Sequence, residues 1–444
     1  MSNAAEIASR ISVLRRRPAS QAPGGGSALR GGSLTIADQV IASGTTFATS
    51  VLIGRTCSKE EFGLYMLGFS VLTFLMTIQG SLISTPYMIY YPRTEENHRP
   101  RFTGSALLFQ LTLGVIVALL IVVGAFIAWQ LQPTSGMTGM LLALGIAISF
   151  LLLRDFIRQV CFAQFEVSRA VAFDASVAAW QLGALGILAI AGALNASSEL
   201  LALGSACAVG SLGWYWSRRA AIAIHLPSAK GDLALAWSSG KWLFASGLVW
   251  SISMNLYAWL IVGFHGAASV GAWGVALGTV TLLNPLILGL QNYLGPHIMH
   301  AYARGGVEQL ARTVLKSSLT YAGSLLLFSA VLFLAGDFLV VLLYGPKYAG
   351  SGLLVALLSI NLVFVALGFC LSRGLFAMEE ASLDFRVNFV ALAAMLVLGI
   401  GFARAYGPMG AALGQIAASA SAAVVRVAVF ILAFRRAQGA RACT

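Results

Sequence analysis

Long apolar runs recur along the whole chain, and charged residues, glycine or proline separate them. Many reach about eighteen residues, the length at which an α-helix crosses the hydrocarbon core of a bilayer. They are continuous and do not alternate apolar with polar positions, as the strands of a membrane barrel do. We therefore predict membrane helices at residues 34–54, 64–86, 104–131, 138–153, 171–193, 200–217, 242–264, 270–294, 317–335, 351–372, 388–403 and 409–432.

Composition supports membrane helices rather than the interior of a soluble protein. Apolar residues make up 58% of the chain and charged residues only 10%, against about 25% charged residues in an ordinary soluble domain. The mean hydropathy is +0.84, so much of the apolar surface must face lipid. The predicted fold class is all-α, a polytopic membrane protein of about twelve transmembrane helices.

The basic residues test this count independently, because lysine and arginine collect on the cytoplasmic side of a membrane. Of the 28 lysines and arginines, all but Arg55, Lys59, Lys347 and Arg404 fall in the N-terminal tail, in every second connection or at the C-terminal end. A missed helix would mix the two sides. The pattern predicts an even number of helices with the N- and C-termini in the cytoplasm.

The polar segments divide the chain into parts. Residues 1–33 combine arginines with prolines and a glycine run, which predicts a disordered basic cytoplasmic tail. The polar stretch at 218–241 is predicted to be a cytoplasmic linker between two six-helix bundles, at 34–217 and 242–434. The last residues, 435–444, form a second cytoplasmic tail.

The two bundles carry similar motifs. Phe62-Gly63-Leu64-Tyr65 opens the second helix and Val270-Gly271-Ala272-Trp273 opens the eighth, and each helix then runs to a proline followed by basic residues. Six helices return the chain to the same side of the membrane. The pattern indicates a parallel repeat, with chance similarity of two apolar helices as the alternative.

No constellation typical of an enzyme is present. Nucleophile, zinc-protease and phosphate-loop motifs are absent from the sequence, and the predicted outer loops are short. His297 and His300 share a helical face without carboxylate or thiolate neighbours, so we predict no metal site. The five cysteines have no paired spacing. Transport is therefore favoured over catalysis, and the net charge of +12 is explained by topology without a nucleic-acid partner.

A few ionisable residues lie inside the predicted spans, where they are costly and often functional. Asp38 and Asp174 lie early in the first and fifth helices, as ion-coupling groups or as acids favoured by the helix dipole. Arg426 lies deep in the last helix and either binds substrate or extends to the interface. Arg154 and Arg158 are one turn apart, and we predict contact with anionic lipid headgroups, with a substrate phosphate as the alternative.

Uncharged amides also occur deep in the predicted spans. Each one alone is best explained as a hydrogen-bonding contact between helices, whereas their number suggests a polar interior. They are Gln79, Gln110, Gln181, Asn255, Asn284, Gln291, Asn361 and Gln415.

Four segments together resemble the polysaccharide flippases of the multidrug/oligosaccharidyl-lipid/polysaccharide (MOP) exporter superfamily. They lie in order at the predicted outer ends of the helices and span most of residues 34–434. They are Ser58-Lys59-Glu60-Glu61-Phe62-Gly63-Leu64-Tyr65, Val270-Gly271-Ala272-Trp273, Leu343-Tyr344-Gly345-Pro346-Lys347-Tyr348 and Tyr406-Gly407-Pro408-Met409-Gly410-Ala411-Ala412.

The resemblance implies a MATE-like pair of six-helix bundles around a cavity that opens to either side in turn. It implies transport of a polyprenyl-pyrophosphate-linked oligosaccharide or exopolysaccharide precursor across a bacterial inner membrane. The alternatives are a cation-coupled multidrug exporter of the same superfamily, a glycan-processing enzyme and a structural partner in a secretion complex. Expected partners are the lipid-linked glycan, membrane lipids and, alternatively, other polysaccharide assembly proteins.

The sequence departs from the resemblance at one position. Many relatives carry Asn-x-Asp in the seventh helix, where this chain has Asn255-Leu256-Tyr257. If a proton or sodium gradient drives transport without a bound cofactor, Asp38 or Asp174 has to supply the ion-coupling group. The predicted substrate-binding residues are Arg426, Arg55, Asn255, Gln291, Asn361 and Gln415.

Overall fold

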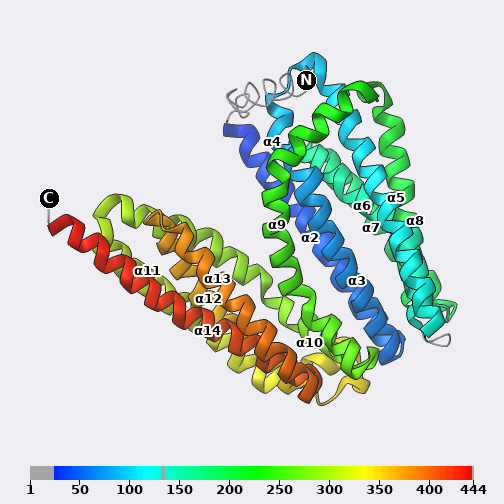
Figure 1. Ribbon diagram of the computed structural model, residues 1–444. Helices are drawn as coiled ribbons and strands as arrows, with labels where there is room; N and C mark the ends of the chain where they lie inside the picture. Colours follow the sequence, from blue (N-terminus) through cyan, green and yellow to red (C-terminus); the bar gives the residue numbers. More distant parts are fainter. Residues whose placement is uncertain (1–24, 132–135, 443–444) are drawn as a thin grey trace. The chain divides into compact units, whose positions relative to one another are not determined.

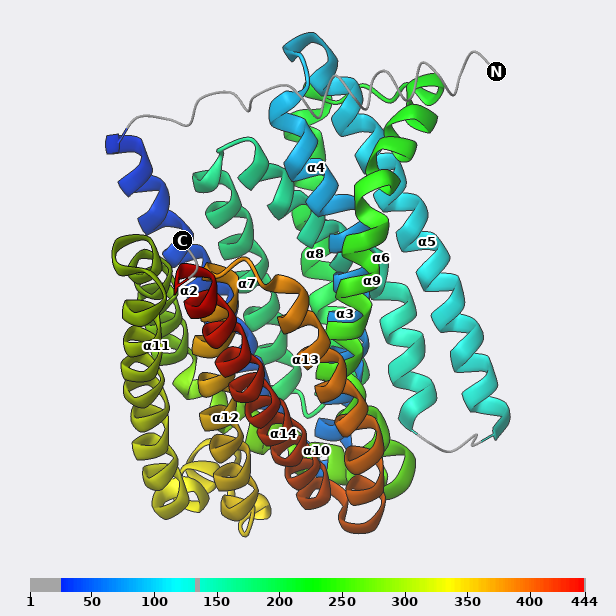
Figure 2. The same ribbon diagram turned by 60° about the vertical axis from the view of Figure 1, so that its left-hand side comes forward.

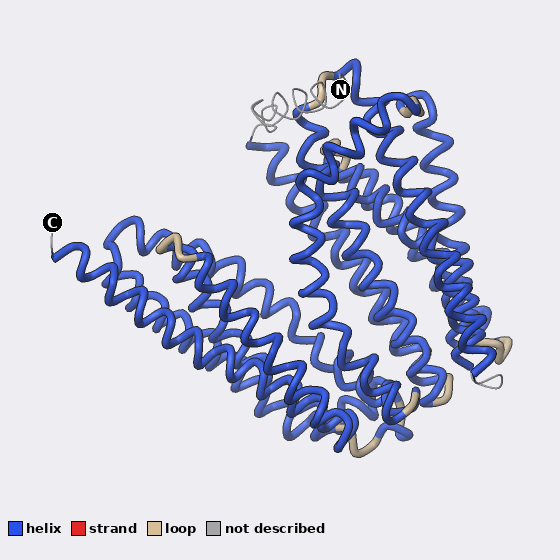
Figure 3. The backbone as a smooth tube through the Cα atoms, viewed as in Figure 1, coloured by secondary structure: helices blue, strands red, loops and turns tan. Residues whose placement is uncertain are grey.

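The computed structural model describes residues 25–131 and 136–442, and within them it is built of helices without strands (Figure 3). The helices in the first half of the chain are α2 (Gly25–Thr56), α3 (Lys59–Gln79), α4 (Thr85–Tyr90), α5 (Arg99–Leu131), α6 (Gly136–Ala163), α7 (Val167–Ile190) and α8 (Ala196–Arg218). The later helices are α9 (Leu226–His265), α10 (Ala267–Val280), α11 (Asn284–Tyr344), α12 (Gly352–Ala377), α13 (Ala381–Ala394) and α14 (Ile400–Ala442) (Figure 1). The predicted all-α membrane fold is confirmed.

Nine stretches of the described residues are long and apolar enough to cross a membrane. Two of the nine contain a break, because α11 has non-helical geometry at Gly305 and Gly306 and α14 has it at Gly407. Each of these stretches therefore holds two helices. The helix α8, with 23 residues, is not among the nine. With it, each of the twelve predicted helices has a counterpart.

Several helices are longer than predicted. The fourth predicted helix, 138–153, is α6 with 28 residues, and it continues through Arg154 and Arg158. The seventh begins at Leu226 rather than at 242. The first begins at Gly25, so residues 25–33 of the predicted disordered tail are helical. The rest of the predicted tail, residues 1–24, lies outside the described residues. The predicted helices were too short because each was ended at a charged residue, whereas some of these charges form ion pairs inside the protein.

The chain forms two compact units, which are described separately. Unit 1 comprises residues 1–57 and 64–255, and unit 2 comprises 58–63 and 256–444. In unit 1, α6 packs between α5 and α8, and α2 packs along α7 (Figures 1 and 2). In unit 2, α12 packs against α11 and α14.

A stripe along α6 forms the centre of unit 1. Met140, Leu144, Ile148 and Leu152 follow one another at intervals of one turn and are fully buried. The close contact of α6 with α8 depends on small residues, since a Cβ atom added to Gly204 would lie 2.6 Å from the Cβ of Ala147. Exposed apolar residues cover the outer face of α5, as expected for a helix in lipid.

The motifs of the sequence repeat meet inside unit 2. A Cβ added to Gly63 would lie 1.8 Å from the carbonyl oxygen of Ala267, and one added to Gly271 would lie 2.4 Å from that of Lys59. Each glycine thus faces the backbone four residues before the other. Phe62 also packs against Tyr344, with ring centroids 5.8 Å apart. Residues from three of the four signature segments are therefore brought together in unit 2.

Candidate functional site

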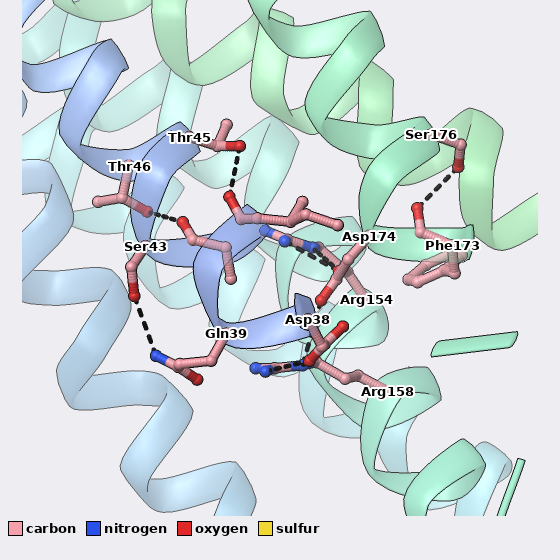
Figure 4. Close-up of polar contacts among 12 residues, drawn as sticks. Asp38, Gln39, Ser43, Thr45, Thr46, Arg154, Arg158, Phe173, Asp174 and Ser176 are labelled. Carbon is pink, nitrogen blue, oxygen red and sulfur yellow. Dashed lines mark hydrogen bonds and ion pairs between the residues drawn. The ribbon is translucent and has the colours of Figure 1, made fainter. Parts of the chain in front are cut away.

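Four charged side chains meet inside unit 1, and three helices supply them (Figure 4). Asp38 lies on α2, Asp174 on α7, and Arg154 and Arg158 lie on α6. The two arginines are four residues apart and so share one face of α6. Both aspartates are fully buried, and their charges therefore need compensation within the protein.

The arginines provide that compensation. Arg154 donates from Nε and Nη2 to Asp174 Oδ1 at 3.0 and 2.9 Å. Arg158 donates from Nε and Nη2 to Asp38 Oδ2 at 2.9 and 2.5 Å, and its Nε also lies 3.1 Å from Asp174 Oδ2. Asp174 thus contacts both arginines, whereas Arg158 is the ion-pair partner of Asp38. The half-buried Asp155, on the same helix, adds a further charge that interacts with both arginines.

This network was only partly predicted. The sequence identified all four residues but assigned lipid or phosphate contact to the arginines, and the structure gives them carboxylate partners. The helix-dipole interpretation is wrong for Asp38, because α2 begins at Gly25, several turns before it. The ion-coupling role of Asp38 and Asp174 stays a prediction. Because arginines already balance both acids, neither is an isolated anionic site for a cation.

A second buried ion pair lies in unit 2. Arg426 on α14 donates from Nε to Asp384 Oδ1 at 2.8 Å and from Nη2 to Asn388 Oδ1 at 2.6 Å. Asn388 in turn donates to Asp384 Oδ2 at 3.3 Å. Arg426 is only 8% exposed, so of the two alternatives given for it, extension to the membrane interface is wrong. Gly368 on α12 makes room for the guanidinium, since a Cβ there would lie 2.7 Å from Arg426 Nη1.

We expect replacement of Arg426 with methionine to lower the free energy of unfolding by about 3–5 kcal/mol, because Asp384 then stays buried without its cation. Unfolding in mixed detergent micelles measures this loss. The double variant Asp384→Leu/Arg426→Met removes both charges and is expected to recover most of the stability. Equal stability of Arg426→Met and the wild type would show that this ion pair contributes nothing.

The other predicted substrate-binding residues are divided between the units. Arg55 is exposed in the last turn of α2, and Asn255 accepts a hydrogen bond from Thr73 at 3.1 Å within unit 1. In unit 2, Gln291 interacts with the hydroxyl of Tyr321. The buried amide oxygens of Asn361 and Gln415 lack a hydrogen-bond partner among the described residues. Their role in substrate binding stays a prediction.

Three buried acids were not singled out from the sequence. Asp232 is 6% exposed and accepts a hydrogen bond from Ser105 Oγ at 2.8 Å. Asp384 precedes the predicted helix 388–403, and Glu199 precedes the predicted helix 200–217. Charged residues are common just before a membrane helix, so neither acid stood out. In the structure they are 4% and 1% exposed. No group of three or more histidine, cysteine or acidic side chains that could bind a metal occurs within residues 25–131 and 136–442.

The chain is similar in sequence to one known protein family. The model of the family described as "Polysaccharide biosynthesis protein" matches residues 28–293, more than half of the chain. No sequence among the curated proteins matches.

Among solved structures, an inward-facing multidrug resistance MATE family transporter of the MOP superfamily is similar, with a TM-score of 0.70, 15% identity and 98% of both chains covered. Its outward-facing form gives a TM-score of 0.59 at 16% identity, covering 97% of this chain and 98% of the other. A MOP superfamily transporter from Pyrococcus furiosus gives 0.57 at 16% identity, covering 91% and 94%. The chain has the fold of these transporters, and it belongs to the polysaccharide biosynthesis protein family.

Proposed function

We propose that the protein is a flippase that moves a polyprenyl-pyrophosphate-linked oligosaccharide, or a similar exopolysaccharide precursor, across a bacterial inner membrane. Both termini face the cytoplasm in this proposal, as the distribution of lysine and arginine predicts. The observation that carries the proposal is the match to the polysaccharide biosynthesis family in a chain with a transporter fold.

The buried arginines suit such a substrate. A pyrophosphate carries charges that hydrocarbon does not accept, so its path needs cationic and polar groups. In Arg154 and Arg158, the atoms Nε and Nη2 are turned toward carboxylates, while the side chains stay 25% and 22% exposed. The guanidinium group has further N–H donors on its other edge, and its planar shape matches phosphate oxygens. In our proposal the exposed edges of Arg154 and Arg158 contact the phosphates.

The second candidate function is a multidrug exporter, because two of the similar structures named above are those of a multidrug resistance transporter. Exporters of cationic drugs are expected to present unpaired acids to their cargo. In the part of the chain that the structure describes, Asp38, Asp174 and Asp384 are each paired with arginine. This pairing makes these three carboxylates poor sites for a cationic substrate.

Deletion of the gene tests the proposed function directly. We expect the deletion strain to accumulate lipid-linked oligosaccharide on the inner leaflet and to lose the exported polysaccharide. Plasmid-borne wild-type protein is expected to reverse both effects. Normal export in the deletion strain, combined with increased sensitivity to cationic drugs, would favour the exporter instead. Genes for glycosyltransferases beside this one would add independent support.

A further inference from the structure

Unit 1 contains a buried carboxyl group that has no cation beside it. Glu199 lies in the first turn of α8 and is only 1% exposed. Its Oε1 accepts a hydrogen bond from Gln181 Nε2 on α7 at 3.2 Å, and the same nitrogen lies 3.3 Å from Thr49 Oγ1 on α2. The other oxygen, Oε2, has no hydrogen-bond partner within the described residues.

The surroundings of Glu199 differ from those of Asp38, Asp174 and Asp384, which arginines neutralise. The helices packed against α8 are α6 and α7, and α2 packs on α7. The charged residues of α6 are Arg154, Asp155 and Arg158. On α2, the exposed Arg55 lies six residues from Thr49, about 9 Å at the helical rise, and on α7 Asp174 lies seven residues from Gln181, about 10 Å. The Cys207 thiol, on α8 itself, is a titratable group that interacts with Glu199.

An ionised carboxylate in this setting is unfavourable. Transfer of a carboxylate from water into the protein costs several kcal/mol of free energy. One amide hydrogen bond and the partial positive charge at a helix N-terminus offset only a small part of this cost. A protonated carboxyl group resolves the problem, since it is neutral and its O–H can donate where Oε2 now has no partner. The sealed site therefore favours the acid form.

The position of Glu199 connects its protonation to the charged cluster. Thr49 and Asp38 lie eleven residues apart on α2, about three turns, and Gln181 and Asp174 lie seven apart on α7, about two turns. The same faces of α2 and α7 thus carry both polar layers. Loss of the proton would leave a carboxylate that needs water, and separation of α2, α7 and α8 would admit it.

We propose that Glu199 is a proton-binding site that couples transport to the proton gradient. It carries a proton while α2, α7 and α8 are closed around it, and it releases the proton when these helices separate to admit water. The proposal rests on the transport function stated above. It assigns coupling to Glu199 rather than to Asp38 or Asp174.

Infrared spectroscopy of the purified protein in lipid tests the site without any glycan. We expect an absorption band of a protonated carboxyl group at neutral pH that is missing in Glu199→Gln. This substitution keeps the size of the side chain and a neutral group beside Gln181. The matched control is Asp337→Asn, because Asp337 is an acid that accepts hydrogen bonds from the backbone at Gly350 and Gly352. A spectrum unchanged by Glu199→Gln would overturn the proposal.

Transport provides the second readout. In vesicles with a pH difference of one unit, exchange of one proton per cycle shifts the ratio of the probe between leaflets by about tenfold. The probe is undecaprenyl pyrophosphate carrying a short oligosaccharide. We expect this shift in the wild type, reversed when the gradient is reversed, and none in Glu199→Gln, which still equilibrates the probe. A wild type that equilibrates the probe without responding to the gradient would overturn the coupling but not the flippase function, whereas no equilibration at all would contradict the function itself.

Discussion

Replacing Arg158 with methionine is expected to lower the free energy of unfolding of unit 1 by about 3–5 kcal/mol. Asp38 is fully buried and pairs with Arg158, so this change leaves its carboxylate without a counterion. Methionine keeps much of the aliphatic stem and separates the loss of charge from the loss of packing. Unfolding in mixed micelles, followed by circular dichroism, measures the difference.

The contacts within the network predict an order of stability among its variants. Arg154→Met should cost less than Arg158→Met, because Asp174 keeps its contact with Arg158 Nε at 3.1 Å. Asp38→Asn combined with Arg158→Met should recover much of the loss. Glu96→Gln, in an exposed ion pair with Arg99, should change stability by less than about 1 kcal/mol. If Arg158→Met were no worse than Glu96→Gln, the buried pair would not stabilise unit 1.

Replacing Gly63 with alanine is expected to destabilise unit 2 by about 1–3 kcal/mol or more. The new Cβ would lie 1.8 Å from the carbonyl oxygen of Ala267, and a backbone atom of a packed helix cannot move aside as a flexible side chain can. Gly271→Ala should behave alike, since its Cβ would meet the carbonyl oxygen of Lys59 at 2.4 Å. The fraction of protein that is monodisperse after purification, together with its thermal unfolding, measures the effect.

The matched control for Gly63→Ala is Gly183→Ala. Gly183 lies inside α7, and a Cβ there meets nothing within 4 Å, so alanine should leave stability unchanged or raise it slightly. Purification of Gly63→Ala with the yield and unfolding temperature of the wild type would mean that the close contact of the two repeat motifs is not needed.

The helices could be predicted because lipid imposes the same requirement on every span. Apolar length and the alternation of basic residues were enough for the class of fold and for the number of helices. Their ends were harder, because the prediction treated each charge as the edge of the membrane. The helix α6 continues past Arg154 and Arg158 because aspartates from other helices neutralise these residues inside the protein.

The candidate site illustrates the same limit. Asp38, Asp174 and Arg426 stand out in the sequence because they interrupt apolar runs. Their pairing could not be predicted, since Arg158 is 120 residues from Asp38 and Asp384 is 42 residues from Arg426, and one sequence contains no signal for contacts over such separations. Glu199 was missed because an acid just before an apolar run resembles an ordinary helix start. Its isolation is evident only once α2, α7 and α8 are placed around it.

Flipping in reconstituted vesicles tests the central claim most directly. Purified protein is placed in liposomes that contain undecaprenyl pyrophosphate linked to a short oligosaccharide, and an added glycosidase then trims the glycan exposed outside. We predict that protein-free vesicles protect the inner half of the glycan, whereas vesicles with the protein expose nearly all of it. Continued protection of the inner half in vesicles that contain folded protein would contradict the account.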